Sequence, residues 1–386
     1  MALQIDASAL IALENSRSGA GFFVTAFYGA TQTVPGPAFP DIDRVPITTD
    51  GQLTFDVSGQ IQASGSVFLA RDTGGESLVP KSMTDPLAPF GQELRIDYVV
   101  SQGGASWRVP LGIYRINEVP RAQEYFRRYP AAARIIGWSA ELALVDRFDL
   151  IRAASFLGVT APAAGNTVLQ EVANLTTAAG VTCAWPAWLQ DSAIPSGVTY
   201  EGDRLDAISQ LLASLNCDPG MTRQGSVTAI RRDRWTSATR DDADIEIDGV
   251  LSFADGLSAN IYNTVVVTNP NETLPPGIAQ ITDPANPLRV DGPLGARVYT
   301  NSNPLMDTTA KLQAAAQTIL ARVSQLGSKT IEVQAPPRPD AELGDLVWAR
   351  DTLSGREVIG QLRSFTVPMD PTAAWTYNLD GAELLG

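Results

Sequence analysis

Residues 330–348 read TIEVQAPPRPDAELGDLVW. Apolar and polar side chains alternate at 330–333, which is typical of a half-buried strand. The prolines within 336–339 make the next segment rigid, because the pyrrolidine ring fixes φ. Gly344 and Asp345 follow this proline turn and open a second apolar strand. The stretch therefore predicts a strand, a rigid turn and a further strand.

The residues on either side extend this pattern. An amphipathic helix is predicted over 307–326, with Asp307 accepting from the backbone amides of the first turn and Gly327 ending the helix. A hairpin return is predicted at 357–362, and a last, aromatic strand at 375–379. The C-terminal residues thus predict a β-rich unit that includes one long helix.

The first part of the chain, 1–150, reads as one mostly β domain. Apolar and polar residues alternate at 53–57 and again at 94–100, and residues 107–116 return as the partner of the second strand. Residues 30–50 are rich in proline and predict a loop.

The middle part, 156–245, is more helical and predicts an α+β module. Asn166 is placed to cap a helix that stops at Gly180, and Asp203 to cap a second helix with apolar residues three and four apart. A hairpin centred on 223–226 follows.

The last part, 246–386, returns to a strand-rich pattern that also holds the helix at 307–326. Residues 260–267 predict a strong strand. Repeated proline, glycine, asparagine and aspartate predict a long loop over 269–304. The fold class is therefore a β-rich α+β chain, in which two β regions flank a smaller α+β module.

This plan resembles the hub proteins of phage tail baseplates. Residues 89–94 (PFGQEL), followed by 110–116 (PLGIYRI), are similar to minor tail proteins of actinobacterial siphophages. Residues 344–347 (GDLV), after their helix, resemble the C-terminal tube-like domain of the hubs. Weaker landmarks of the family are similar to 262–265 (YNTV) and 225–227 (GSV).

The resemblance implies two tail-tube-like domains, each a β-barrel or sandwich, flanking the α+β module. In that family a homotrimeric ring continues the six-fold tail tube, so the two domains would be related by a rotation of about 60°. Implied partners are the distal tail or tail tube protein, the central fibre or tip protein and the tape measure protein, with DNA only in transit. The resemblance implies a structural protein of the virion and no enzyme. It implies no catalytic, cofactor-binding or metal-binding residue.

Composition excludes several kinds of site. The 386-residue chain contains no histidine, so a Ser-His-Asp or Cys-His mechanism and any histidine-containing zinc site are excluded within it. Cys183 and Cys217 are read as reduced core residues, with a disulfide as the alternative. A formal net charge of −14 argues against a stably bound nucleic acid, because phosphate binding needs a basic face.

The sequence gives no sign of a membrane-bound or secreted protein. No apolar run reaches the roughly 18 residues that a membrane helix needs. The first residues lack the basic and apolar stretches of a secretory signal. We therefore expect synthesis in the host cytoplasm and no membrane partner.

An acidic segment has two interpretations. Asp244, Glu246, Asp248, Gly249 and Asp255 fall at positions 1, 3, 5, 6 and 12 of an EF-hand loop. However, Glu at position 3 and Asp at position 12 depart from the pattern, and the flanks lack helices. Isoleucines alternate with the acids as on a half-buried strand, so the sequence favours a solvated strand face over a calcium site.

Two further clusters also have two readings. Trp185 and Trp188 could stack on sugars or bases, but aromatic packing in a core or interface is the commoner role. Arg231, Arg232 and Arg234 form a compact basic run, for which salt bridges to the acidic residues at 241–248 are favoured over phosphate binding.

Three alternatives to a hub remain open. The first is a hexameric distal tail ring, which shares a tube-like N-terminal domain. The second is a receptor-binding protein for cell-wall glycans. The third is a tail-associated glycosidase, because two carboxylates suffice for that chemistry and the chain has many.

Overall fold

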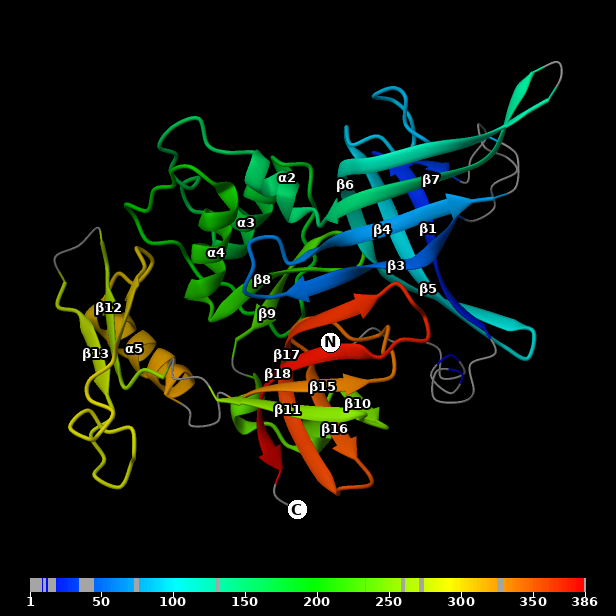
Figure 1. Cartoon of the computed structure of the whole chain (residues 1–386). Coiled ribbons are helices and arrows are strands. Elements are labelled where there is room, and N and C mark those ends of the chain that lie inside the picture. The colour runs from blue at the N-terminus through cyan, green and yellow to red at the C-terminus, as the bar shows by residue number, and fades with distance from the viewer. Residues whose placement is uncertain are drawn as a thin grey trace.

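A computed structural model of the chain describes residues 9, 12, 19–34, 45–72, 76–129, 132–232, 234–257, 261–270, 274–324 and 329–384. Most strands in these residues join one large sheet that bends into two β bodies, and the helices lie to one side of it (Figure 1). Within the described residues, no helix is long and apolar enough to cross a membrane.

The N-terminal β body is a closed barrel. Its strands follow the order β3-β4-β7-β6-β5-β1, and the pairing of β1 with β3 closes the circle. The strands are β1 (Gly19–Tyr28), β3 (Val45–Asp56), β4 (Ala63–Arg71), β5 (Gln92–Gln102), β6 (Ala105–Arg128) and β7 (Ala133–Val145), and β2 (Thr31–Val34) pairs with β1. We call β1 and β3–β7 the N-terminal barrel.

The alternation predicted at 94–100 is confirmed in β5. The apolar side chains at its even-numbered positions are fully buried, and β6 returns antiparallel to β5. The loop predicted over 30–50 is wrong, because β2 and the first half of β3 lie in this range. The beginning of β3 pairs with the distant strand β1, so local composition does not report it.

The C-terminal β body has the strand order β11-β15-β18-β17-β16-β10. All of its neighbouring strands pair antiparallel except β10 and β16, which are parallel. The strands are β10 (Ile245–Asp248), β11 (Ser252–Leu257), β15 (Lys329–Ala335), β16 (Leu346–Asp351), β17 (Arg356–Pro368) and β18 (Trp375–Leu384). We call them the C-terminal sheet.

The two β bodies share an edge and a core. The second half of β17 pairs antiparallel with β3, so that Phe365 lies opposite Phe55. The two rings stack with centroids 4.2 Å apart. One hydrophobic cluster extends from the barrel through this contact to Trp375 and Tyr377 of β18. The barrel and the C-terminal sheet therefore form a single hydrophobic unit.

The middle module packs beside both bodies. It contains α2 (Phe148–Ala153), α3 (Val168–Thr177), α4 (Arg204–Ser214), β8 (Cys217–Met221), β9 (Val227–Arg231) and the short 3-10 helices η1 (Arg234–Ser237) and η2 (Arg240–Asp242). Asp203 caps α4 as predicted, accepting from the Leu205 amide at 2.7 Å. The cap of α3 is Thr167 instead of Asn166, whose Nδ2 donates to Glu171.

A fourth unit combines a strand and a helix that fall where they were predicted, at 260–267 and 307–326, with two strands inside the predicted loop. Strands β12 (Thr264–Thr268), β13 (Gly277–Gln280) and β14 (Val298–Ser302) form a separate small sheet, and α5 (Thr309–Val323) packs on it (Figure 1). The loop prediction over 269–304 is therefore wrong. Within this segment, β13 and β14 are short strands among polar residues, and each pairs with β12. We call β12–β14 and α5 the α5 unit.

The beginning of α5 also differs from the prediction. Thr308 is the N-cap, and its hydroxyl accepts from the Lys311 amide at 3.2 Å. Asp307 lies one residue earlier and binds the Lys311 ammonium at 2.6 Å. Gly327, which was predicted to end the helix, lies outside the described residues.

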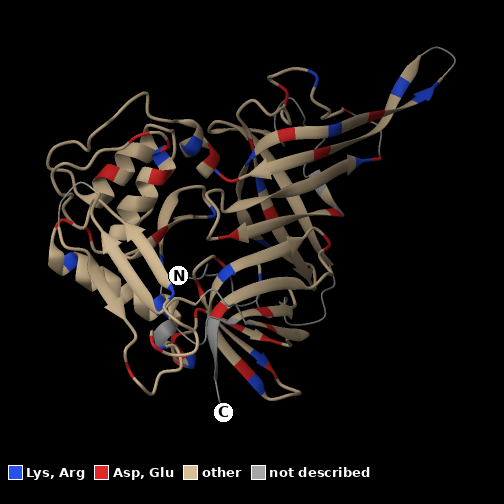
Figure 2. Cartoon of the chain, turned by 60° about the vertical axis from the view of Figure 1, so that its left-hand side comes forward, with Lys and Arg blue, Asp and Glu red and all other residues tan. Residues whose placement is uncertain are grey.

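The described residues confirm a β-rich α+β fold. Acidic and basic residues are interspersed over the four units, whereas the outer end of the long β6–β7 hairpin carries basic residues (Figure 2).

Candidate functional site

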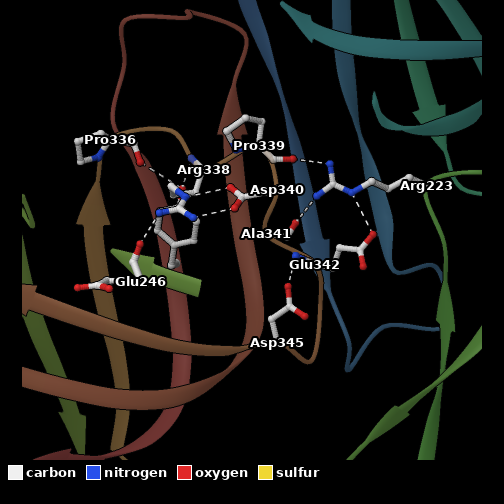
Figure 3. Close-up of polar contacts among 10 residues, drawn as sticks. Arg223, Glu246, Pro336, Arg338, Pro339, Asp340, Ala341, Glu342 and Asp345 are labelled. Carbon is white, nitrogen blue, oxygen red and sulfur yellow. Dashed lines mark hydrogen bonds and ion pairs between the residues drawn. The ribbon is translucent and has the colours of Figure 1, made fainter. Parts of the chain in front are cut away.

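A buried arginine joins the middle module to both β bodies. Arg223 lies in the turn between β8 and β9, and its side chain is 6% exposed. Nη1 donates to the carbonyls of Pro110, at 2.6 Å, and Pro339. Nη2 donates to the Ala341 carbonyl at 2.7 Å, and Nε donates to Oε1 of Glu342 at 3.0 Å (Figure 3). We call these five residues the Arg223 junction.

Arginine suits this position for a physical reason. The guanidinium group remains charged and directs several N–H donors along fixed lines, so it can satisfy carbonyls from separate segments at once. Pro110 belongs to β6 of the barrel, whereas the other partners of Arg223 lie in the turn that precedes β16. The junction therefore fixes three parts of the chain against one another.

A second arginine organises the proline turn itself. Arg338 forms a two-pronged contact with Asp340, with distances of 2.9 and 2.7 Å, and donates to the carbonyl of Glu246 (Figure 3). Its backbone amide donates to the Tyr377 hydroxyl at 2.9 Å, and this hydroxyl donates to the Pro336 carbonyl. The buried carboxylate of Asp340 is thus compensated by a charge-assisted pair.

The positions of Gly344 and Asp345 explain why a glycine and an aspartate occur there. Gly344 has a φ of +88°, and a Cβ there would lie 2.3 Å from Cγ2 of Ile230 in β9. Asp345 accepts from the Glu342 amide at 2.8 Å. Burial, together with the nearby carboxylates of Glu342 and Asp244, raises the pKa of Asp345 to about 7.

Another buried carboxyl lies on the barrel side. Oδ2 of Asp146 accepts from the backbone amides of Gln62 and Ala63, at 2.8 and 2.7 Å, and Oδ1 accepts from the amide of Phe148 at 2.9 Å. Burial raises the pKa of Asp146 to about 7. The Gln62 side chain also donates to the Pro219 carbonyl at 2.6 Å, which ties the barrel to β8.

The turn between β8 and β9 is held from the barrel as well. Arg147 pairs with Glu93 through two hydrogen bonds of 2.8 and 2.6 Å, and Nη1 donates to the Gly225 carbonyl at 3.3 Å. The sequence did not predict the roles of Arg147 and Arg223. A single arginine in a turn has no spacing pattern, and its carbonyl partners come from distant segments.

A cavity of about 300 Å³ lies where the barrel, the middle module and the C-terminal sheet meet. Its lining includes Tyr114 and Phe365 from the β bodies, and Trp185 and Trp188 from the middle module. Both tryptophans are partly buried and pack against the core of the middle module. The guanidinium of Arg231 lies 4.3 Å from the centroid of the Trp188 ring. Packing within the chain is therefore the observed role of this aromatic cluster.

The basic run is turned toward protein, as predicted. Arg232 pairs with Asp218 at 2.7 Å, and Arg234 pairs with Asp244 at 2.5 Å. Asp244 also accepts from the Leu346 amide at the start of β16, at 2.9 Å. The predicted salt bridge to the segment 241–248 is thus confirmed for Arg234, whereas Arg232 pairs with β8 inside the middle module.

The acidic segment is a strand face, as the alternation predicted. The isoleucines between the acids of β10 are buried, and the acids are exposed. Arg350 binds Asp248 at 2.8 Å and lies 3.8 Å from Glu246, while Arg356 binds Asp255 at 2.7 Å. Among the described residues, no group of three or more acidic, histidine or cysteine side chains could hold a metal ion.

The two cysteines are thiols and are not joined by a disulfide. Cys217 is buried and its Sγ donates to the Leu215 carbonyl, while Cys183 lies 3.1 Å from the Thr176 hydroxyl. Burial raises the pKa of the Cys183 thiol, which keeps it protonated. Cys217 is a core residue as predicted, whereas Cys183 is half-buried at the edge of the same cluster.

Comparisons with known proteins show similarity in structure but not in sequence. No protein-family model matches the sequence, and neither does any curated protein. The structure is similar to a tail protein from Neisseria meningitidis MC58, with 13% identity and a TM-score of 0.58, over 94% of this chain and 97% of that chain. It is also similar to the 43 kDa tail protein of prophage MuSo2 from Shewanella oneidensis, with 12% identity and a TM-score of 0.51, over 92% and 97% of the two chains. The chain thus shares a fold with tail proteins over nearly its whole length.

Proposed function

We propose that this chain is a structural hub protein of a phage tail tip, which assembles as a trimeric ring. The observation that carries the proposal is the fold shared with a tail protein over 94% of this chain and 97% of the other. A likeness that spans both β bodies and the middle module supports one common architecture. The role follows from that architecture, and not from any reactive group.

The arrangement of the two β bodies supports a ring. The barrel and the C-terminal sheet are joined edge to edge through β3 and β17. If a rotation of about 60° relates them, three copies place six β bodies around one axis, and the ring matches a six-fold tube. The Arg223 junction and the Asp146 contacts would hold the two bodies at that angle during assembly.

The charge of the chain supports a DNA conduit. A trimer would carry a formal charge of −42, three times the −14 of one chain. A negative wall repels phosphates over the roughly 8 Å that screening allows, so DNA would pass without binding. The Arg231, Arg232 and Arg234 side chains contact protein groups, which agrees with a lumen poor in unpaired arginine.

The proposed neighbours follow from the position of such a ring. The distal tail protein or the tube protein would lie above it, and the central fibre or tip protein below it. The tape measure protein would end at the lumen. The sequence likeness at 89–94 and 110–116 favours the minor tail proteins of actinobacterial siphophages as the nearest class.

The mass of the purified protein in solution tests the ring. A trimer of the 41.1 kDa chain weighs roughly 123 kDa, and a hexamer roughly 247 kDa. Antibody labelling of virions tests the location, and we expect gold particles at the tail tip. A hexamer would support the distal ring instead. Binding on a glycan array or turnover of purified peptidoglycan would support a receptor-binding protein or a glycosidase.

A further inference from the structure

The β6–β7 hairpin extends beyond the barrel as an arm. β6 is 24 residues long, and its last part pairs only with β7 and projects from the body (Figure 1). Every residue of 125–129 and of 132–134 is exposed. A strand that covers a core buries alternate residues, so consecutive exposure means that neither face of the arm lies on the body. We call 125–129 and 132–136 the arm.

The arm presents large apolar side chains to solvent. Tyr125, Phe126, Tyr129 and Ile136 are 45%, 61%, 43% and 38% exposed. An isolated two-stranded ribbon is at best marginally stable in water. Clustered exposed aromatic residues are characteristic of a surface that another protein covers. The arm therefore has the composition of an interface.

The charge of the arm is opposite to that of the rest of the chain. Arg127, Arg128 and Arg134 give the arm a charge of +3, and the arm contains no acidic residue. The rest of the chain therefore carries a charge of −17, and the two sum to the net charge of −14. Figure 2 shows the basic residues at this outer end of the hairpin. None of the three arginines forms an ion pair with the residues that the structure describes.

The pairing of the arm repeats this surplus of positive charge. Arg127 lies directly opposite Arg134, and like charges at such a position destabilise a sheet. Both guanidinium groups lie over the ring of Tyr129, with their carbons 5.8 and 5.7 Å from its centroid. A carboxylate brought to this point would remove the repulsion and would complete the pairing.

We propose that the arm docks on an acidic surface of a second copy of this chain and so joins neighbouring subunits of the ring. This inference rests on the proposed function, which requires contacts between identical chains. A closed ring needs a head-to-tail contact, in which one part of each copy meets a different part of the next. The remaining residues carry a net negative charge, which complements that of the arm, and Tyr and Arg are residue types that dominate interface energies.

The test uses the full chain and the concentration at which half of it is trimeric. Phe126→Ser and the double variant Arg127→Glu/Arg134→Glu should each raise this concentration by about tenfold or more, the effect of losing an interface hot spot. Leu353→Ser is the matched control, because Leu353 is 97% exposed in the turn between β16 and β17. Thermal unfolding of each variant checks that the barrel still folds.

The possible results test the arm contact and the proposed hub function separately. Loss of the trimer in both arm variants but not in the control supports the proposal, as does weaker association of the wild type in high salt. Variants that trimerise like the wild type overturn the arm contact, and so does a wild-type chain that stays monomeric. Normal trimers that fail to enter virions would show that the arm binds another tail protein, which also overturns it. Labelling at the tail tip reports on the hub independently.

Discussion

The N-terminal barrel and the C-terminal sheet both consist mainly of antiparallel strands but are closed differently. In the barrel, β1 pairs with both β5 and β3, so backbone hydrogen bonds complete the circle. In the C-terminal sheet, the end strands β10 and β11 pair with β16 and β15 and, within the described residues, not with each other. Backbone hydrogen bonds therefore close the barrel, whereas they do not join the two end strands of the C-terminal sheet.

Arginine side chains hold the end strands of the C-terminal sheet instead. Arg356, at the start of β17, reaches Asp255 on the end strand β11, and Arg338, between β15 and β16, reaches the carbonyl of Glu246 on the end strand β10. The Arg223 junction then holds the turn before β16 from the middle module. We therefore expect the C-terminal sheet to depend more on a few arginines than the barrel does, and four predictions test this difference.

The largest effect is expected at the junction. Arg223→Met keeps an apolar stem but leaves the carbonyls of Pro339 and Ala341 and the Glu342 carboxylate without their donor. Breaking such a buried charged contact costs about 3–5 kcal/mol of unfolding free energy. Urea unfolding at a fixed protein concentration measures it. Arg350→Met, which removes an exposed ion pair, should cost about 1 kcal/mol or less. Equal losses in the two variants would remove the distinction.

The next effect concerns the close approach of β9 to the C-terminal sheet. Gly344→Ala forces a side chain into positive φ and against Ile230, which together should cost about 2–4 kcal/mol. Gly355→Ala is the matched control, because Gly355 has a φ of +72° but no atom near its absent Cβ. It should cost about 1 kcal/mol from the backbone alone. A Gly344→Ala variant no worse than the control would mean that β9 moves aside easily.

The sequence predicted the parts that repeat locally. The alternation at 94–100 predicted β5, and the spacing after Asp203 predicted α4, because period and capping are properties of neighbouring residues. The strands β13 and β14 were missed because they are short, lie among turn residues and pair only with β12. The buried face of β13 packs on α5, which begins about 30 residues further along the chain.

The candidate site could not be predicted in the same way. The motif at 344–345 marked the right turn, but nothing local marks Arg223 as the residue that binds it. Its partners are backbone carbonyls, which every residue carries, so the sequence contains no complementary side-chain pattern. Only the packing of the β8–β9 turn between the two β bodies selects this arginine.

The third prediction contrasts Asp345 with exposed carboxyls. Its pKa is raised to about 7, so between pH 4 and pH 7 the folded chain holds a proton that the unfolded chain has lost. Stability therefore falls as pH rises through this range. Asp345→Asn mimics the protonated form, so its stability relative to wild type should rise by roughly 2–3 kcal/mol from pH 5 to pH 8. Unfolding at the two pH values measures the change.

The control for this effect is Asp370, whose pKa is lowered by hydrogen bonds from Thr372. The Asp370 carboxyl is ionised in both the folded and the unfolded chain between pH 5 and pH 8. The stability of Asp370→Asn relative to wild type should therefore not vary over this range. Asp146→Asn should destabilise at every pH, because both carboxyl oxygens accept from backbone amides and the new Nδ2 could not. A flat profile for Asp345→Asn would mean that Asp345 is ionised in the folded chain.

The smallest effect concerns the α5 unit, which interrupts the C-terminal half between β11 and β15 and has no equivalent among the described residues between the barrel strands. Its core of Val265, Val267, Ala279, Leu312 and Ala316 is separate from that of the two β bodies. Thr308→Ala removes the hydroxyl that accepts from the Lys311 amide, at a cost of about 1 kcal/mol for a lost N-cap. Asp307→Ala removes only the exposed contact with the Lys311 ammonium, which is worth about 0.3–0.5 kcal/mol.

Hydrogen exchange decides whether that cost stays local. If the α5 unit opens by itself, Thr308→Ala should raise amide exchange in α5 and in β12–β14, while the amides of β3 and β17 keep the wild-type rates. Asp307→Ala should change the same amides by a smaller factor. Faster exchange in β3 or β17 would mean that the unit and the β bodies open together. The C-terminal half would then depend on α5 as well as on its arginines, and the contrast with the barrel would be greater than the ion pairs alone suggest.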